Sequence, residues 1–402
     1  MSNVNLKLKY LGINVDITSF VGVLKSKLEK LYDQTETKAL FANISELQLS
    51  KALVNAINIL LEDRFTEGLG KGGWGHSEKV HAKEFFGEQA VARTEDSVMA
   101  SINAILALRE CISLLRQSDS KQAISMLKRI TEIVYNDFSE YIEKRWNKKY
   151  GYGGTLKYCR ENDWNILTSY RHTAWLLLLW LKDLRYVSNI LPTYKYLLEN
   201  FEEIDWKSES IFTDFATYSA FKSALDYNHQ TQLLNISNIP TFLSCLEASI
   251  LSKYDIELSG WTFEHLKTEE NKNRWYAARQ PYTLCVLAEM VDCFNSTSEL
   301  AYSMKHALNQ TISGGWRASE GECGISKMPN EKPDTVLTSI GISVLLRKRI
   351  RTPEEKYFLK GSLEFVITSL AENSNSIRNS YLWPMTYFIR DICNLLNNAK
   401  VF

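Results

Sequence analysis

The most constraining feature of this chain is a regular return of aromatic residues, usually beside glycine, between stretches with helical hydrophobic spacing. Tyr152, Trp206, Trp261 and Trp316 follow one another at intervals of 54, 55 and 55 residues, and Trp74 precedes Tyr152 by 78. Before each of these residues, apolar positions recur every three to four residues, as on one face of a helix. After each, a polar loop leads to a second, more apolar helical stretch. A period of this length predicts a repeat of helix pairs.

The pattern divides most of the chain into six expected helix pairs. Repeated pairs form either open solenoids or closed rings. Because six pairs is the number that closes a ring, we expect an all-α fold, an (α/α)6 toroid of about six helix hairpins over residues 48–402. An open solenoid is the alternative. The expected helices are 48–61 with 94–108, 123–146 with 166–181, 187–201 with 211–225, 241–254 with 276–291, 299–311 with 335–346, and 354–370 with 381–396.

Residues 1–47 form a separate N-terminal unit in this scheme. Apolar residues alternate with polar ones from Val4 to Tyr10 and again from Ile13 to Ile17, on either side of Gly12. This period of two predicts a short β-hairpin over residues 4–17, and the spacing from Thr18 onward predicts a leading helix. The hairpin either clasps the body of the domain or offers an exposed edge to a strand of a partner protein.

Bulk composition excludes several classes of protein. Lys plus Arg number 47 and Asp plus Glu number 47, so the formal net charge is zero. Proteins that bind duplexes usually carry a basic surplus, because phosphate neutralisation supplies their affinity, and we expect no nucleic-acid partner. The longest apolar run, from Ala174 to Leu181, has eight residues. A bilayer requires roughly 20, so we expect no membrane span.

The seven cysteines are scattered, odd in number and without a C-x-x-C pair. This pattern indicates neither a disulfide framework nor a zinc ribbon, and it favours the reducing cytoplasm. The residues after Met1 lack the apolar segment of a secretory signal, which agrees with a cytoplasmic location. His76 and His81 lie five apart, but without a Cys or a third His nearby we expect solvated loop residues rather than a metal site.

We call the segment that joins the two helices of a pair, with its aromatic residue, a corner. The corner of the fifth pair contains a longer sequence motif than the others. Residues Gln310 to Trp316 have the form Q-x-x-x-G-x-W, which resembles the repeat motif of squalene and oxidosqualene cyclases. The glycine-aromatic corner and the helix after it are also similar to those of protein prenyltransferase β-subunits and the wider terpenoid-cyclase toroid superfamily. The resemblance covers about residues 48–396, and the other corners match in spacing rather than in letters. We expect glycine to close each outer helix and the aromatic ring to cover the neighbouring pair.

The catalytic signatures that this resemblance implies do not carry over. Class II cyclases supply their acid from D-x-D-D, and metal-dependent ionisation of a diphosphate uses D-D-x-x-D. Neither motif occurs in this chain. Protein prenyltransferases hold zinc with an Asp, a Cys two residues later and a distant His, and we expect no such site and no other cofactor. Whether the chain is an enzyme stays open.

Charged and polar residues at the starts of the inner helices are the candidate binding residues. In a toroid these starts face one mouth of the central cavity, where helix N-termini favour anions and arginine binds phosphate or carboxylate through paired hydrogen bonds. Ordinary roles are the alternative, because acidic residues in a first turn cap helices and arginine or histidine is often packed or paired. The candidates are Asp96, Arg171, His172, Asp214, Arg279, Gln280 and Asp334.

Three functions remain compatible with the sequence. The first is a non-catalytic or atypical terpenoid-cyclase-like toroid that binds a partner protein through the hairpin, or a small anionic or apolar ligand in the central cavity. The second is an enzyme of the prenyltransferase or terpenoid cyclase type with non-standard catalytic acids. The third is a carbohydrate-active (α/α)6 enzyme that uses carboxylates such as Asp96, Asp214 or Asp334.

Overall fold

A computed structural model of the chain describes residues 39–62, 64–65, 71–75, 96–116, 121–147, 151–152, 166–182, 186–261, 282–314, 316–319, 322–326, 332–372 and 382–397. This part of the protein is predominantly helical, as expected. The N-terminal hairpin predicted over residues 4–17, the leading-helix stretch predicted from Thr18 onward, and the site candidates Arg279 and Gln280 lie outside the described residues.

Every helix expected from the repeat has a counterpart in the structure. The first three pairs are α3 (Glu46–Glu62) with α5 (Val98–Leu115), α6 (Lys121–Glu132), η2 (Ile133–Asp137) and α7 (Phe138–Glu143) with α9 (Ile166–Leu181), and α10 (Val187–Asn200) with α11 (Ile211–Thr231). The last three are α12 (Ile239–Ser252) with helical residues 282–289, α14 (Glu299–Gly314) with α15 (Thr335–Arg347), and α16 (Pro353–Ala371) with α18 (Leu382–Asn397). Short 3-10 helices also occur, η4 (Phe201–Glu203) and η7 (Val291–Asn295).

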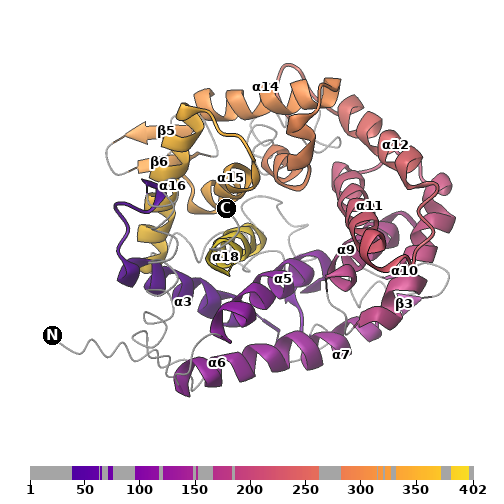
Figure 1. The fold of residues 1–402 in the computed structure, drawn as a ribbon, viewed down its shortest axis with the longest axis horizontal. Helices are drawn as coiled ribbons and strands as arrows, with labels where there is room; N and C mark the ends of the chain where they lie inside the picture. The colour runs from indigo at the N-terminus through magenta and orange to yellow at the C-terminus, as the bar shows by residue number, and fades with distance from the viewer. Residues whose placement is uncertain are drawn as a thin grey trace, which may run out of the picture.

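The first helix of each pair lies on the outside and the second lies toward the middle of the molecule (Figure 1). Burial follows the same division. Residues 98–108 of α5 and 211–221 of α11 are buried on every side, as expected for helices flanked by neighbours. The outer helix α16 instead buries residues such as Leu359, Leu363 and Val366 along one stripe, while Tyr357 is exposed.

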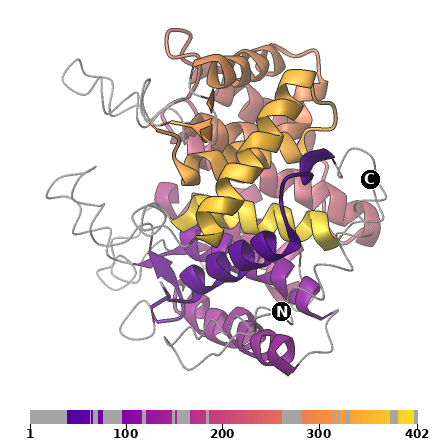
Figure 2. The same cartoon turned by 90° about the vertical axis from the view of Figure 1, so that its left-hand side faces the viewer.

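The beginning and the end of the described chain pack against each other. Helix α5 packs on α18, and α3 packs on α16; Figure 2 shows the yellow C-terminal helices beside the indigo N-terminal ones. Polar contacts cross the same boundary, since Asn55 Nδ2 donates to Leu370 O at 2.8 Å. In the inner layer, Cys111 Sγ and Cys393 Sγ are 3.7 Å apart although 282 positions separate them. The first and last helix pairs are therefore direct neighbours.

Glycine has the predicted role at two corners. Gly72, before Trp74, has φ +93°, and Gly151, before Tyr152, has φ +78°. Residues with a Cβ adopt this left-handed region at a cost of roughly 1–2 kcal/mol. A Cβ on Gly151 would also clash with Thr173 Oγ1 on α9. Both positions thus require glycine for conformation and for space.

Short antiparallel strand pairs mark three of the corners. They are β1 (Trp74–Gly75) with β2 (Asp96–Ser97), β3 (Trp146–Asn147) with β4 (Gly151–Tyr152), and β5 (Trp316–Ser319) with β6 (Glu322–Ile325). Each pair joins the chain leaving an outer helix to a segment nearby in sequence. None of these strand pairs forms a core layer of its own.

The corner indoles bind the ends of outer helices. Trp74 Nε1 donates to Leu60 O at 2.6 Å, near the end of α3, and Trp261 Nε1 donates to Ile250 O at 2.8 Å, near the end of α12. Trp206 Nε1 likewise donates to Phe201 O, just after α10. The last carbonyls of a helix lack partners within the helix, so each indole satisfies one of them. These hydrogen bonds lie within one pair, whereas we expected the ring to cover the neighbouring pair.

A second hydrogen bond recurs at four places where a helix pair turns, between the turn and the inner helix. The backbone N–H of a corner residue donates to the hydroxyl oxygen of a serine or threonine on the following inner helix, an arrangement that we call the hydroxyl clasp. Its four examples are Trp74 to Ser101 at 2.9 Å, Tyr152 to Thr173 at 2.9 Å, Trp261 to Thr283 at 3.0 Å and Ile325 to Thr338 at 2.9 Å. The clasp fixes the corner to the inner helix, as the indole fixes it to the outer one.

Among the described helices, α5 alone has the length and apolar composition of a membrane-crossing segment. In this structure 83% of that segment is buried inside the protein. Core helices of globular proteins pass the same test of length and hydropathy. Its packing against α18 and α9 accounts for its apolar character.

Candidate functional site

The structure describes five of the predicted site residues, which lie at or near the starts of inner helices, and it gives several of them structural roles: Asp96, Arg171, His172, Asp214 and Asp334. Asp334 precedes α15, where its Oδ1 accepts the Leu337 N–H at 2.9 Å. It is therefore the helix cap that was the alternative interpretation. Asp96 lies in β2, with its backbone paired to Gly75. Neither residue is among those that line the cavity described below.

Asp214 forms a buried ion pair between α11 and the residue that directly follows the outer helix α12. Its carboxylate pairs with Lys253, and Ser249 Oγ lies 3.3 Å from Asp214 Oδ2. Lys253 Nζ and Ser249 Oγ also donate to Trp206 O, at 2.6 and 2.7 Å. Because burial outweighs the attraction of Lys253, the pKa of Asp214 is raised to about 7.

The position of this pair explains its role. Asp214 is the fourth residue of α11, as Ser101 is of α5 and Thr338 is of α15. In the third pair an ion pair bound to the Trp206 carbonyl therefore stands where a hydroxyl clasp stands elsewhere. The raised pKa of Asp214 has a structural origin, and this residue does not line the cavity.

Arg171 and His172 lie on α9, one after the other. Burial lowers the pKa of the Arg171 guanidinium, and Glu209 and Tyr282 partly oppose this shift. His172 is buried as well. Like Asp214, they lie away from the residues that line the cavity. The described candidates thus do not line that cavity, although Arg171 and Asp214 both interact electrostatically with Glu209.

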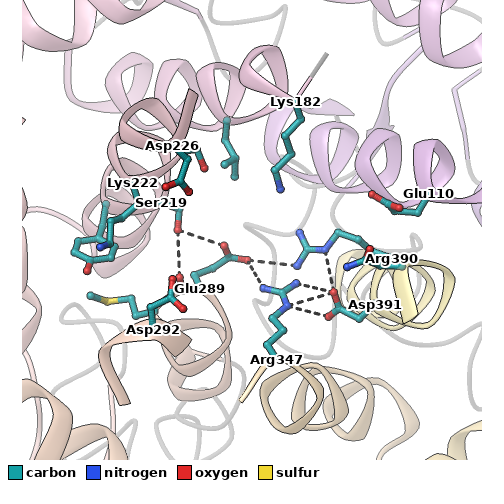
Figure 3. A pocket seen from close by; sticks show the side chains of 15 residues that line it. Glu110, Lys182, Ser219, Lys222, Asp226, Glu289, Asp292, Arg347, Arg390 and Asp391 are labelled. Carbon is teal, nitrogen blue, oxygen red and sulfur yellow. Dashed lines mark hydrogen bonds and ion pairs between the residues drawn. The ribbon is translucent and has the colours of Figure 1, made fainter. Parts of the chain in front are cut away.

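A cavity of about 330 Å³ lies between the inner helices, toward their C-terminal halves (Figure 3). All six inner helices, or the residues directly after them, contribute to it. Glu110 lies near the end of α5, Lys182 follows α9, and Arg347 ends α15. The cavity is lined by Glu110, Leu178, Lys182, Tyr218, Ser219, Lys222, Ser223, Asp226, Glu289, Met290, Asp292, Arg347, Arg390, Asp391 and Asn394.

The lining is charged, and its charges are nearly balanced. It contains four cations, Lys182, Lys222, Arg347 and Arg390, and five carboxylates, Glu110, Asp226, Glu289, Asp292 and Asp391. Tyr218 is the only aromatic residue in this lining, among the described residues. The largest buried rings, such as Trp175 and Trp180, pack in the core instead. The described cavity therefore lacks the aromatic wall that stabilises carbocations in a cyclase.

Arg347 lines the cavity and is held by several hydrogen bonds. Its Nε lies 3.2 and 3.1 Å from the two carboxylate oxygens of Asp391, and its Nη2 lies 3.1 Å from Oδ1. Its Nη1 donates to Ala288 O at 3.0 Å, near the end of helical residues 282–289. Asp391 and Glu289 keep the pKa of Arg347 above its usual range, although burial acts against them. This arginine is thus permanently charged and held in place.

Glu289 and Arg390 make fewer hydrogen bonds than Arg347 does. Glu289 Oε2 is 3.3 Å from Ser219 Oγ, but Oε1 lies 3.7 Å from both Arg347 Nη1 and Arg390 Nη2. That separation is an ion pair without a hydrogen bond. Both Glu289 Oε1 and Arg390 Nη2 are buried without a hydrogen-bond partner in the described part of the chain. Buried polar atoms are rarely left so, which makes this the most informative point of the cavity.

The Lys182 side chain points into the cavity from the opposite side (Figure 3). Its pKa is lowered by the loss of water around it, and Arg347 and Arg109 add to that shift while Glu289 and Glu110 oppose it. The side chain nevertheless keeps access to solvent. Burial also raises the pKa of Glu110. The cavity thus offers a partly desolvated ammonium opposite the Glu289–Arg390 pair.

Sequence reasoning overlooked one motif and misplaced the site. Asp391-Ile392-Cys393 has the D-x-C spacing of the zinc ligands in protein prenyltransferases. In the structure Asp391 binds Arg347, whereas Cys393 faces Cys111. No cluster of three metal-binding side chains occurs among the described residues. The signal for the cavity was the presence of charges such as Glu289 and Arg390 inside otherwise apolar inner helices.

Comparison with known proteins gives no further guide: no family model, no curated protein and no solved structure matches this chain.

Proposed function

We propose that the chain is an (α/α)6 toroid, similar in architecture to terpenoid cyclases, that binds a small polar ligand in its central cavity as a non-catalytic cytoplasmic subunit. The packing of α5 on α18 and of α3 on α16 supports the closed ring, because an open solenoid keeps its first and last pairs apart. The division into outer and inner helices supports the same architecture.

The observation that supports ligand binding is the charged cavity, to which all six inner helices or the residues directly after them contribute. An apolar isoprenoid in this space would remove water from the charges around it without replacing their hydrogen bonds, which is costly. A polar ligand restores those hydrogen bonds. The lining therefore favours a polar ligand over the apolar one and over the isoprenoid-converting enzyme.

The other functions have weaker support. A carbohydrate-active enzyme was expected to use Asp96, Asp214 or Asp334, but Asp214 is committed to Lys253 and Asp334 to the cap of α15. A partner protein at the N-terminal hairpin remains a separate proposal, since residues 4–17 lie outside the described chain. Binding at the cavity is the function that the described residues favour.

Blocking the cavity with Ser223→Phe tests this function. Ser223 lies on α11 and lines the cavity, so a phenyl ring there removes ligand space. The purified full chain is dialysed against a small-metabolite extract, and bound compounds are identified by mass spectrometry. We expect a compound enriched by the wild type and lost from S223F.

The matched control is Ser244→Phe, on an exposed position of the outer helix α12. This variant should retain the compound as the wild type does. Circular dichroism confirms that both variants fold. Equal enrichment by S223F and the wild type, or no enrichment by the wild type, would contradict a ligand in the cavity.

A further inference from the structure

We propose that the ligand is a small neutral polyhydroxylated compound, a sugar or polyol, with one hydroxyl bound beside Glu289 Oε1 and Arg390 Nη2. This inference rests on the proposed function and names the chemical class of the ligand. It depends on two atoms of opposite hydrogen-bonding character that lie side by side and lack partners in the described chain. Figure 3 shows both side chains at the centre of the cavity.

The two atoms need a group that both donates and accepts. Glu289 Oε1 only accepts and Arg390 Nη2 only donates, and the Glu289 and Arg390 side chains are 6% and 10% exposed. A hydroxyl accepts from the guanidinium while it donates to the carboxylate, so it satisfies both at once. Both hydrogen bonds then involve a charged partner, which makes them stronger than neutral ones.

A charged ligand group fits this place less well. A carboxylate or phosphate accepts from Arg390 but is repelled by Glu289 Oε1 and by the Asp391 carboxylate, whose oxygen lies 3.5 Å from Arg390 Nε. An ammonium pairs with Glu289 but is repelled by Arg347 and Arg390, each with a nitrogen 3.7 Å from Oε1. Four cations and five carboxylates around the cavity also leave no strong field of either sign.

The rest of the cavity suits additional hydroxyls. Lys182 offers N–H donors from the opposite wall, and Asp226 and Ser223 on α11 offer acceptors. The volume of about 330 Å³ lies at the lower end of small-molecule sites, which run from about 300 to 1,000 Å³. A ligand of monosaccharide size therefore matches both the space and the distribution of donors and acceptors.

Calorimetric titration of the full chain tests the class of ligand. The neutral probes are glucose, mannose, galactose and myo-inositol, and the charged analogues are glucuronate and glucosamine. We expect at least one neutral probe to bind, and its charged analogues to bind at least about tenfold more weakly, a difference of roughly 1.4 kcal/mol. Tighter binding of a charged analogue, or no binding of any neutral probe, overturns the inference.

The variant Glu289→Gln distinguishes a ligand that donates a hydroxyl hydrogen bond from an anionic ligand. The carboxylate accepts a charge-assisted hydrogen bond from the hydroxyl, so E289Q should lower the affinity for the neutral probe by about tenfold. An anionic ligand would instead bind E289Q more tightly, because a repelling charge has gone. Glu199→Gln, at an exposed ion pair on α10, is the control and should bind as the wild type does.

Lys182→Met provides a second variant if E289Q fails to fold. The Lys182 side chain is exposed to the cavity, so its loss should weaken binding of the neutral probe without unfolding the protein. Unchanged binding by K182M contradicts the contact from the opposite wall. If the dialysis experiment finds only a charged compound that S223F loses, the cavity function stands and the polyol inference fails; if nothing is retained, both fail.

Discussion

Replacing Lys253 by methionine should lower the free energy of unfolding by about 3–5 kcal/mol, because it leaves the buried Asp214 carboxylate without its cation. Asp214 is fully buried and Lys253 is 9% exposed. The ammonium also holds the Trp206 carbonyl at the third corner. Urea unfolding followed by circular dichroism above pH 7, where Asp214 of the wild type is ionised, measures the loss.

The double variant Asp214→Asn with Lys253→Met should recover most of that stability. A buried ion pair adds little net stability over neutral partners, since desolvation offsets the attraction between the charges. The exposed pair of Lys144 and Glu140, 3.0 Å apart on and beside α7, provides the control. Lys144→Met should cost far less than Lys253→Met, because water and salt screen an exposed pair. An equal loss for Lys144→Met and Lys253→Met would contradict the interpretation.

The carboxyl group of Asp214 should make the free energy of unfolding depend on pH. Its pKa is raised from 3.8 to about 7 in the folded protein, so the folded state binds a proton more tightly than the unfolded one. The contribution of this group is complete below pH 3.8 and is lost as the pH rises through about 7. We expect the stability advantage of the wild type over D214N to fall across that interval. A constant difference between the two proteins would refute the assignment.

The helices were predictable because their cause lies in the sequence itself. A stripe of apolar residues at intervals of three and four can be buried only on a helix, and aromatic corners at intervals of 54 and 55 residues show where each pair turns. The range expected for α16 differs from the observed one by one residue at each end, whereas α11 begins where expected and continues to Thr231 instead of ending at 225. Glycines 72 and 151 were likewise predictable, since no other residue adopts their φ cheaply.

The site was not predictable to the same degree. Helical periodicity places a residue on a face, but it does not say which half of the helix opens onto a cavity. We expected ligands at the starts of inner helices, whereas the cavity lies toward their ends, beside Arg347 and Glu289. The ion pair of Asp214 with Lys253 joins residues 39 positions apart, and no local pattern reveals that pairing.

The corner tryptophans lead to the second prediction, which joins the repeat in the sequence to the stability of the fold. Trp261→Ala should lower the free energy of unfolding by about 3–5 kcal/mol, the usual cost of truncating a buried large ring. Trp261 is fully buried, and Tyr254 packs edge-on against it with ring centroids 5.0 Å apart. Its indole and backbone N–H groups bind α12 and Thr283 respectively. Denaturant unfolding measures the effect.

Two variants show whether the loss comes from the corner or from any aromatic residue. Trp261→Phe keeps a ring but removes the N–H that binds Ile250 O, so it should cost less than alanine and more than the roughly 1 kcal/mol of that hydrogen bond alone. Trp146→Ala removes an indole that is 36% exposed, and should cost well under half of the Trp261→Ala loss. Hydrogen exchange should then quicken at the end of α12 in W261A but not in W146A. Equal losses for both tryptophans would mean that the corner indole has no special part in holding the helix pair together.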